Sequence, residues 1–192
     1  NLCNGSPAAD SVPGLIAAKA NVTVTGPNGA RDIAVEDIPA GPGKTTLKPG
    51  EVISAIMLPP RGRNGGDAYL RFIPRTEMDI AVVGCAVNLR LDGDRIVEAR
   101  VALGAVAPTV LLVPQAADAI IGTALDEAAL DALAAAARAA CKPISDKRGT
   151  VEFRTDIAGV LARRAARIAY DRAKGVNQGA RCTCQRPSMA RR

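Results

Sequence analysis

Histidine is absent from this 192-residue chain, and its absence excludes several classes of catalytic site. A Ser/His/Asp triad, a histidine-paired catalytic cysteine and the usual catalytic zinc sites all need an imidazole. We therefore expect no catalytic residue and no metal site among the side chains of this protein. Whatever chemistry occurs here is expected to come from a cofactor.

Aromatic residues are scarce, with two tyrosines, two phenylalanines and no tryptophan. The core must therefore use Ala, Val, Ile and Leu, which predicts closely packed elements with small residues at their contacts. The scarcity also argues against a nucleic-acid partner, because bases stack on aromatic rings. The net charge of +6 does not favour one either: residues 174–192 hold five basic and no acidic side chains, which leaves 20 basic and 19 acidic groups in residues 1–173.

Cysteines are few and apolar runs are short. The five cysteines are an odd number without the dense, even spacing of a secreted disulfide framework, which favours a reducing, cytoplasmic setting. No uninterrupted apolar run reaches the roughly 18 residues of a membrane span, so none is predicted. The chain begins at Asn1 without an initiator methionine, and we expect an upstream portion to be missing.

The first half of the chain predicts one short helix and three strands. The turn residues Gly26–Gly29 join two of the strands as a hairpin, and Pro-Gly and Pro-Pro pairs bound the third. We expect a mobile loop over Arg61–Gly66. The helix is predicted over Ser11–Ala20, and the strands over Asn21–Thr25, near Arg31–Val35 and over Glu51–Leu58.

The second half predicts a long hairpin followed by helices. Two β-rich runs, Ile80–Leu91 and Arg95–Val106, flank the turn pair Asp92-Gly93. Helices are predicted over Asp126–Ala140 and over about Val151–Lys174, with Gly175 as the C-cap. Without regular βαβ alternation the fold class is α+β, and a boundary near Asp79 divides it into two subdomains. The basic tail, residues 175–192, is expected to be disordered.

Two glycine- or cysteine-containing motifs each allow a functional and a plain interpretation. The Gly41–Thr45 segment is similar to a phosphate loop, but Ile38 stands where that motif requires its first glycine, so a simple turn is favoured. Cys182 and Cys184 form a C-x-C pair that could bind a metal. No histidine and no second close cysteine pair complete such a site, so we expect none.

Two acids precede the long hairpin and also allow two interpretations. Glu77 and Asp79 could act as paired carboxylates, or they could simply form a solvated entry to the strand. Charged groups usually lie at the surface, which favours the solvated entry. Carboxylates alone therefore identify no hydrolase.

A series of sequence landmarks resembles one family of flavoproteins. The segment Asn1–Asp10, NLCNGSPAAD, is similar to the stretch after the paired glycines of the second flavin loop in the FAD subunit of the xanthine dehydrogenase and carbon monoxide dehydrogenase group. The resemblance extends to about residue 173. The further landmarks, in the family's order, are Gly41–Thr45 with Leu47–Glu51, Ala68–Phe72, Met78–Val83, Gly104–Thr109, and Pro143–Asp146 ahead of Arg148 and Phe153-Arg154.

The resemblance implies a two-part fold and an electron-transfer role. Residues 1–78 would be the remainder of a PCMH-type FAD-binding domain. Residues 79–174 would be a small α+β domain, like the C-terminal domain of the carbon monoxide dehydrogenase flavoprotein, with an antiparallel sheet packed on helices. In this family a molybdenum-pterin large subunit hydroxylates the substrate, the 2Fe-2S clusters of a small subunit relay electrons, and the FAD of this medium subunit passes them to an acceptor. The chain would thus be an oxidoreductase subunit of a cytoplasmic hetero-oligomer.

The family's first glycine-rich loop and the glycines before Asn1 are not in this chain. Pyrophosphate binding depends on such close backbone approach, so we expect this chain alone to bind FAD weakly or not at all and to be inactive in isolation. The alternative is a non-catalytic docking module, a truncated subunit that binds only the partner subunits.

Four residues of the first segment are implied to contact FAD. Asn1 and Ser6 would lie near the FAD phosphates, and Asp10 would hydrogen-bond the ribityl region. Cys3 holds a position that is usually apolar and is interpreted as a small hydrophobe. For Ser6 and Asp10 the alternative is capping of the following helix, since both are good N-cap residues.

Three further residues are implied to contact the flavin ring. Val52 and Ile53 would cover the isoalloxazine, or they could be ordinary core residues of a strand. Arg71 stands where the family more often has lysine, and a fixed cation there would favour the anionic reduced flavin. The alternative for Arg71 is an ion pair with an acid across the sheet.

Overall fold

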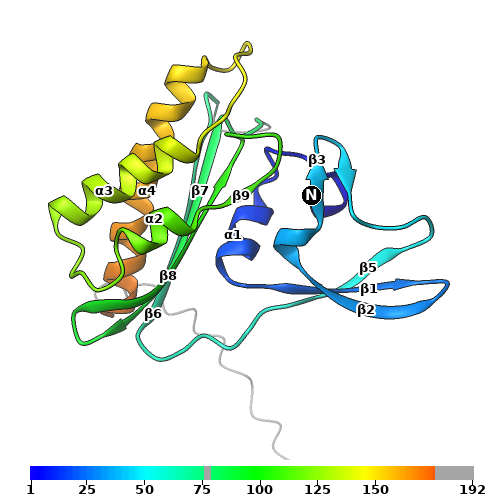
Figure 1. The fold of residues 1–192 in the computed structure, drawn as a ribbon, viewed down its shortest axis with the longest axis horizontal. Coiled ribbons are helices and arrows are strands. Elements are labelled where there is room, and N and C mark those ends of the chain that lie inside the picture. Colours follow the sequence, from blue (N-terminus) through cyan, green and yellow to red (C-terminus); the bar gives the residue numbers. More distant parts are fainter. Residues whose placement is uncertain (76–78, 176–192) are drawn as a thin grey trace, which may run out of the picture.

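The chain folds into two units that lie side by side in a computed structural model, which describes residues 1–75 and 79–175 (Figure 1). The first unit holds short strands around a small core, and the second is a longer sheet backed by helices. The first unit comprises η1 (Leu2–Asn4), α1 (Ser11–Ala17), β1 (Asn21–Gly26), β2 (Gly29–Ala34), η2 (Val35–Asp37), β3 (Pro39–Gly41), β4 (Lys44–Thr45) and β5 (Val52–Met57). The second comprises β6 (Gly65–Phe72), β7 (Val83–Asp92), β8 (Arg95–Gly104), β9 (Leu111–Leu112), α2 (Pro114–Asp118), α3 (Glu127–Ala140) and α4 (Val151–Ala173).

The first unit is built on an antiparallel sheet with the strand order β2-β1-β5. Val22 and Val24 alternate with polar residues along β1 and point into a core that includes Ile16 and Ile38. The hairpin predicted around Gly26–Gly29 is confirmed by the pairing of β1 with β2. A second hairpin, β3 with β4, carries the turn that was predicted at Gly41–Thr45.

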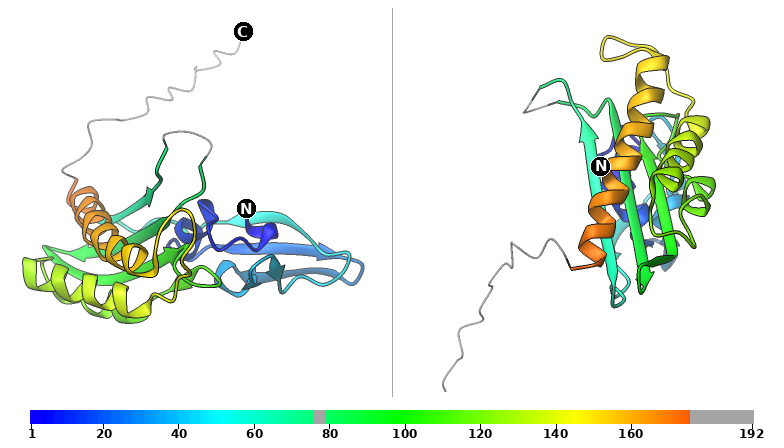
Figure 2. Two further views of the ribbon diagram at one scale, coloured as in Figure 1. Left: turned by 90° about the horizontal axis from the view of Figure 1, so that it is seen from above. Right: turned by 90° about the vertical axis from the view of Figure 1, so that its left-hand side faces the viewer.

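The second unit is an antiparallel sheet with the order β6-β7-β8-β9, and α3 and α4 cover one of its faces (Figure 2). Strand β7 alternates strictly, so that Cys85, Val87 and Leu89 are buried toward the helices. Helix α4 meets the sheet through small residues, as the shortage of aromatics predicted; they are Ala158, Ala162, Ala165, Ala166 and Ala169, all fully buried. The backbones therefore approach closely. A Cβ built on Gly66 of β6 would lie only 2.0 Å from the carbonyl oxygen of Ala169.

The opposite face of the second sheet receives α1. Two donors from the sheet satisfy carbonyls at the C-terminal end of this helix: Asn88 Nδ2 donates to Ala17 O at 3.1 Å, and Arg100 Nε donates to Ile16 O at 3.1 Å. The guanidinium of Arg100 also forms an ion pair with Glu36 of the first unit. The Asn88 bond satisfies a carbonyl in the last turn of the helix, the Arg100 bond adds a second donor to Ile16 O, which also accepts from the Lys19 amide, and these bonds hold the two units together.

Most of the predicted elements are confirmed, with shifted ends. The predicted β7–β8 hairpin forms, but its two turn residues are Gly93 and Asp94, one position after the predicted pair, because Asp92 still pairs with Arg95. Helices α3 and α4 match the two predicted helices, with Gly175 at φ 78° after α4. Helix α1 ends at Ala17 instead of Ala20, where Asn88 and Arg100 take its last carbonyls.

Strand β6 was not predicted. It begins at Gly65, inside the segment predicted as a mobile loop, and pairs with β7 along its whole length. Paired glycines at its start and the polar residues Asp67 and Arg71 conceal its alternation, in which Ala68, Leu70 and Phe72 face the helices. The second sheet thus extends N-terminally beyond Asp79, where the sequence placed the boundary.

Some predictions concern residues that the structure does not describe. Disorder was predicted for the tail, residues 175–192, of which only Gly175 is described. The C-x-C pair Cys182 and Cys184 also lies outside the described residues, in the segment 176–192. Glu77 lies in the second such segment, 76–78. Within the described ranges, no helix has both the length and the apolar character needed to cross a membrane, and no three Cys, Asp or Glu side chains gather as a metal site would require.

The close contact at Gly66 leads to a stability prediction. Gly66→Ala is expected to lower the free energy of unfolding by at least about 2 kcal/mol, because backbone atoms of α4 leave no room for a methyl group. Gly14→Ala in α1 is the matched control: nothing lies within 4 Å of its added Cβ, so a gain of about 0.5–1 kcal/mol is expected. Urea denaturation measures both. Equal stability of the two variants would contradict the packing described here.

Candidate functional site

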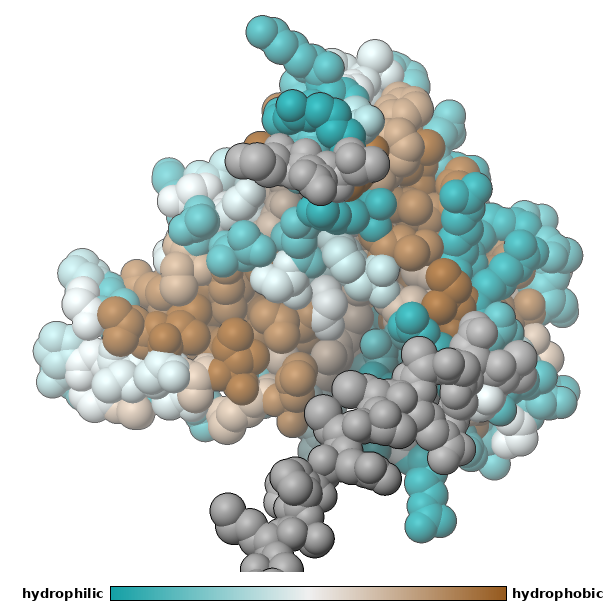
Figure 3. Space-filling model, turned by 180° about the vertical axis from the view of Figure 1, so that it is seen from behind, coloured by the Kyte–Doolittle hydropathy of each residue, from teal (hydrophilic) through white to brown (hydrophobic). Residues whose placement is uncertain are grey.

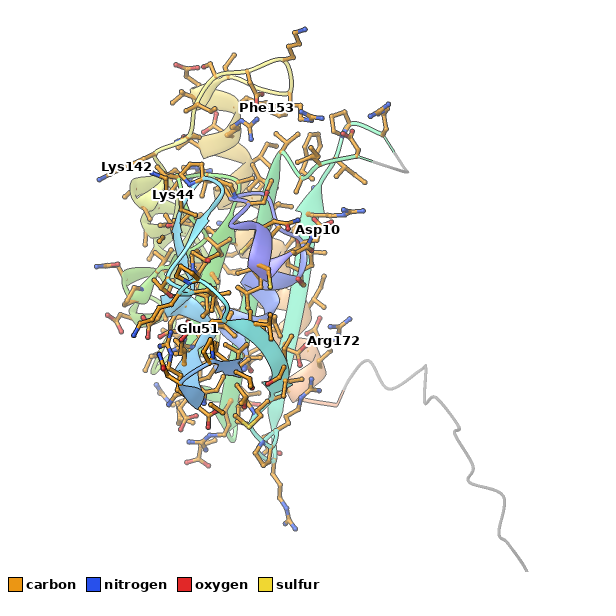
Figure 4. All side chains as sticks on the ribbon, turned by 90° about the vertical axis from the view of Figure 1, so that its right-hand side faces the viewer. Asp10, Lys44, Glu51, Lys142, Phe153 and Arg172 are labelled. Carbon is orange, nitrogen blue, oxygen red and sulfur yellow. The ribbon has the colours of Figure 1, made fainter. Side chains whose placement is uncertain are left out.

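Asp10, Tyr69 and Arg71 meet where the two units join (Figure 4 labels Asp10). Asp10 precedes α1, and its carboxylate reaches across to β6. Arg71 Nη1 donates to Asp10 Oδ2 at 2.5 Å, and the Tyr69 hydroxyl donates to Asp10 Oδ1 at 3.4 Å. Tyr69 and Arg71 are two residues apart on one strand and so share a face. Their pairing with one carboxylate follows from that geometry.

The three side chains differ in their access to solvent. The Asp10 side chain is 44% exposed and that of Arg71 is 33% exposed, so the ion pair is accessible. Tyr69 is more enclosed, and a Cβ built on Gly84 of β7 would lie 3.0 Å from its hydroxyl. Burial, and then the charge of Asp10, raise the pKa of the Tyr69 phenol, which remains a protonated donor.

The structure tests the capping and ion-pair alternatives for Asp10, Ser6 and Arg71, whereas their flavin contacts stay predictions. Asp10 occupies the N-cap position of α1, but its side chain makes no capping bond, so the capping alternative is wrong: a charged partner on β6 takes the carboxylate instead. The Ser6 hydroxyl accepts from the Ala8 amide within its own turn and does not cap α1 either. Arg71 does form an ion pair, but the acid is Asp10, which precedes α1 and does not lie across the sheet. The flavin contact of Arg71 stays a prediction.

The segment around Asn1 and Cys3 is an ordered loop. Asn1 Oδ1 accepts from the Ser11 hydroxyl at 3.3 Å, which keeps the start of the chain beside α1. Gly5 has φ 56°, and a Cβ on it would lie 2.6 Å from the backbone of Lys44, so the loop is fixed against the β3–β4 hairpin. Cys3 is exposed and belongs to neither core, and its interpretation as a small hydrophobe of the flavin site stays a prediction. Neighbouring Leu2 is the buried residue.

Val52 and Ile53 lie on β5 and face opposite ways, as successive strand residues must. Ile53 pairs with Val24 and packs against the first core, whereas Val52 is 61% exposed, so the core alternative is wrong for Val52.

Ile56, Met57 and Leu58 are also exposed, and Figure 3 shows apolar surface over this part of the molecule. Glu51, next to Val52, lies apart from Asp10 in Figure 4. The predicted flavin contacts therefore fall into two groups, one at Asp10 and one on β5.

A cleft of about 960 Å³ opens between α1, the segment after β5 and the part of the second sheet that carries Asp67, Arg90 and Glu98. Ser11 and Tyr69 line it, so it adjoins the Asp10 site. Four of its charged side chains form ion pairs within the lining: Arg90 with Glu98, at 2.6 Å, and Arg61 with Asp67.

Asp79 corrects another expectation. Its side chain is only 3% exposed, so the solvated strand entry is wrong for this residue. Its carboxylate accepts from the amides of Ile80 at 2.9 Å and Arg75 at 3.2 Å and forms ion pairs with Arg75 and Arg148. Burial alone would raise the pKa of Asp79, but these hydrogen bonds and charges outweigh it and hold the pKa below its usual value. The acid thereby ties the segment after β6 to the loop before α4.

The buried Asp79 leads to a pH prediction. Because its folded pKa is lowered, its stabilisation is complete above the unfolded pKa of about 3.9 and is lost as the pH falls through the folded value. Asp79→Asn is expected to destabilise the protein at pH 7, and this deficit should shrink below about pH 4. Urea denaturation between pH 7 and pH 3 measures it. Asp92→Asn in the exposed β7–β8 turn is the control, and parallel pH profiles for Asp79→Asn and the unchanged protein would contradict the assignment.

Two family models match the chain in succession. Residues 1–61 match the FAD binding domain in molybdopterin dehydrogenase, and residues 68–169 match the CO dehydrogenase flavoprotein C-terminal domain. The second match alone spans more than half of the chain. The chain thus belongs to the FAD-binding subunits of the molybdenum hydroxylase family, a class of FAD-dependent oxidoreductase components.

Individual relatives agree with this class. The carbon monoxide dehydrogenase medium chain of Afipia carboxidovorans is 40% identical over 174 residues, which cover 91% of this chain and 60% of the relative. The xanthine dehydrogenase FAD-binding subunit of Escherichia coli O157:H7 is 30% identical over 176 residues, with coverage of 91% and 60%. The structure of reconstituted CO dehydrogenase from Oligotropha carboxidovorans superposes with a TM-score of 0.85 at 38% identity and covers 89% of this chain and 59% of that chain. This chain therefore spans about 60% of the length of these relatives.

Sequence reasoning did not find three residues that shape the site. Tyr69 was considered only as part of the family landmark Ala68–Phe72. It lies two residues before Arg71, so an extended strand there would have placed both side chains on one face. Asn88 and Arg100 belong to the long hairpin and point at α1, which precedes them by about 70 to 85 residues. Nothing local in the sequence indicates that contact.

Proposed function

We propose that this chain carries one part of the FAD site in an electron-transfer subunit of a molybdenum hydroxylase complex. The observation that carries the proposal is the solvent-accessible Asp10–Arg71 pair beside the ordered loop at Asn1–Gly5. Both residues were implied as flavin contacts from opposite ends of the first 71 residues, and folding brings them into direct contact.

The side chains present fit the chemistry of FAD. A carboxylate has about four acceptor positions, and Asp10 uses two of them, for Tyr69 and Arg71. The remaining positions suit the hydroxyl donors of a ribityl chain. The exposed Val52 on β5 suits an aromatic ring. FAD, when bound, supplies the redox chemistry, and these residues would bind it and orient it.

Arg71 would set the charge around the flavin. In the present arrangement its positive charge is balanced by Asp10, so the pair as a whole is neutral. Arginine keeps its charge at every accessible pH and donates through a planar fork, which allows it to hold Asp10 and face a second acceptor. A reduced, negatively charged flavin beside this pair would meet a cation and not an isolated carboxylate.

The remaining parts of the proposal concern the complex. We infer that the chain works in the cytoplasm beside a molybdenum-pterin subunit and a 2Fe-2S subunit, from which electrons reach FAD and then an acceptor. Its three cysteines within the described ranges are free thiols, which suits a reducing compartment.

A docking module is the second candidate function. The exposed apolar row Val52, Ile56, Met57 and Leu58 supports it, because contiguous apolar surface marks contact with another protein surface. Such a module would bind the partner subunits without FAD.

Titration with FAD separates these functions. The chain and a version extended N-terminally to the length of its relatives would be compared by flavin fluorescence and visible absorbance. We expect the extended version to bind FAD at least about 100-fold more tightly, since pyrophosphate binding needs the glycine-rich loops. An extended version that stays colourless but still co-purifies with the partner subunits would favour the docking module and refute the flavin function.

Reversal of the charge at Arg71 tests its role in the extended protein. Arg71→Glu changes the neutral pair into two adjacent carboxylates, so the midpoint potential of bound FAD is expected to fall by about 30 mV or more, equivalent to about 1.4 kcal/mol for two electrons. Arg71→Lys keeps the charge and should retain most of the potential. Arg164→Glu, at an exposed position on α4, makes the same charge change away from the site. An unchanged potential in Arg71→Glu would refute the role of Arg71.

A further inference from the structure

We propose that Tyr69 is a positioning residue of the flavin site: together with Arg71 it fixes the Asp10 carboxylate so that its free acceptor positions face the ribityl hydroxyls. The inference rests on the proposed function and deepens it, because it assigns a part to a residue that does not itself need to touch FAD.

The first support is the geometry of β6. Tyr69 and Arg71 project from the same face of the strand and approach different oxygens of Asp10, Oδ1 and Oδ2. Two donors from one strand on two oxygens define both the position and the rotation of the carboxylate. With Arg71 alone, the group could turn about its Cβ–Cγ bond, because a single charged contact does not fix that rotation.

The second support is the space that the fold leaves for the phenol ring. Gly84 on β7 pairs with Arg71, and a Cβ on it would lie 3.0 Å from the Tyr69 hydroxyl and 3.3 Å from the ring. Any larger residue at position 84 would press on the tyrosine. The ring therefore lies directly against β7, in an orientation that directs its hydroxyl to Asp10.

The third support is that the donor is permanent. Burial against the first core, and then the negative charge of Asp10, raise the pKa of Tyr69 above that of a free phenol. The hydroxyl therefore keeps its proton throughout the physiological range. At 3.4 Å the hydrogen bond is long, so Tyr69 acts as much by restricting the Asp10 rotamer as by the strength of the bond.

The test uses the extended protein and measures its FAD dissociation constant. Tyr69→Phe removes only the hydroxyl and is expected to raise the constant about three- to tenfold, the usual effect of losing one hydrogen bond. The only other tyrosine, Tyr170, donates to Asp94 O at 2.7 Å in the second unit, so Tyr170→Phe is a matched loss of a bonded hydroxyl. This control should leave the constant unchanged.

A double-mutant cycle distinguishes positioning from simple packing. If Tyr69 acts through Asp10, then Tyr69→Phe should change the constant less than about twofold once Asp10→Asn is present, because the carboxylate it orients is gone. Gly84→Ala, which displaces the phenol without changing it, should weaken FAD binding in the same direction as Tyr69→Phe.

The outcomes separate this inference from the function on which it rests. An extended protein that binds no FAD overturns both. If it binds FAD but Tyr69→Phe matches the unchanged protein, the positioning role is wrong and the flavin function stands. If Tyr69→Phe weakens binding equally with and without Asp10→Asn, Tyr69 acts independently of Asp10 and the inference is also wrong.

Discussion

Helix α1 packs closely against one face of β7 and β8, because the residues there are small: Gly84, Ala86, Ala102 and Gly104. The approach is close enough for side chains of the second sheet to donate hydrogen bonds to carbonyls at the end of α1. This contact sets the position of the first unit relative to the second. Asp10 stands at the start of α1, so the same contact determines which strand its carboxylate meets. A bulkier residue at Gly104 would strike the ring of Pro13 and move the helix away from β6.

Buried charge supports the end of the second unit near the site. Arg154 is 5% exposed, and its guanidinium donates to Val82 O at 2.6 Å and to the carboxylate of Asp146 at 2.7 Å. Asp79, one loop away, is held by Arg75 and Arg148. A buried ion is costly unless it is paired, and the contacts of the two Arg154 Nη atoms supply that pairing and connect the start of β7 to the start of α4.

The two groups of candidate flavin contacts suit a long ligand better than a compact one. One group gathers polar side chains at the junction of the units, and the other is an apolar row along β5. A dinucleotide with an extended polar linker is the kind of molecule that could use both. The Asp10 group is accessible yet internally paired, so under the proposed function its geometry would be set before FAD binds, which would reduce the ordering needed on binding.

The sequence by itself determined the elements whose signals are local. These are the β1–β2 and β7–β8 hairpins, from their turn residues, and the helices α3 and α4, from their caps and the helical spacing of their apolar residues. It also determined the family, because its motifs follow the family's order, and the family in turn predicted that Asp10 and Arg71 contact FAD. Only the tertiary structure decided that these two residues pair, that Tyr69 joins them, that Val52 faces outward and that Asp79 is buried. The Asp10 contacts and the Asp79–Arg148 ion pair join residues about 60 to 70 positions apart, and the orientation of Val52 depends on the pairing of β5 with β1. In each case a distant partner, and not the local pattern, sets the exposure of the side chain and the charge that it meets.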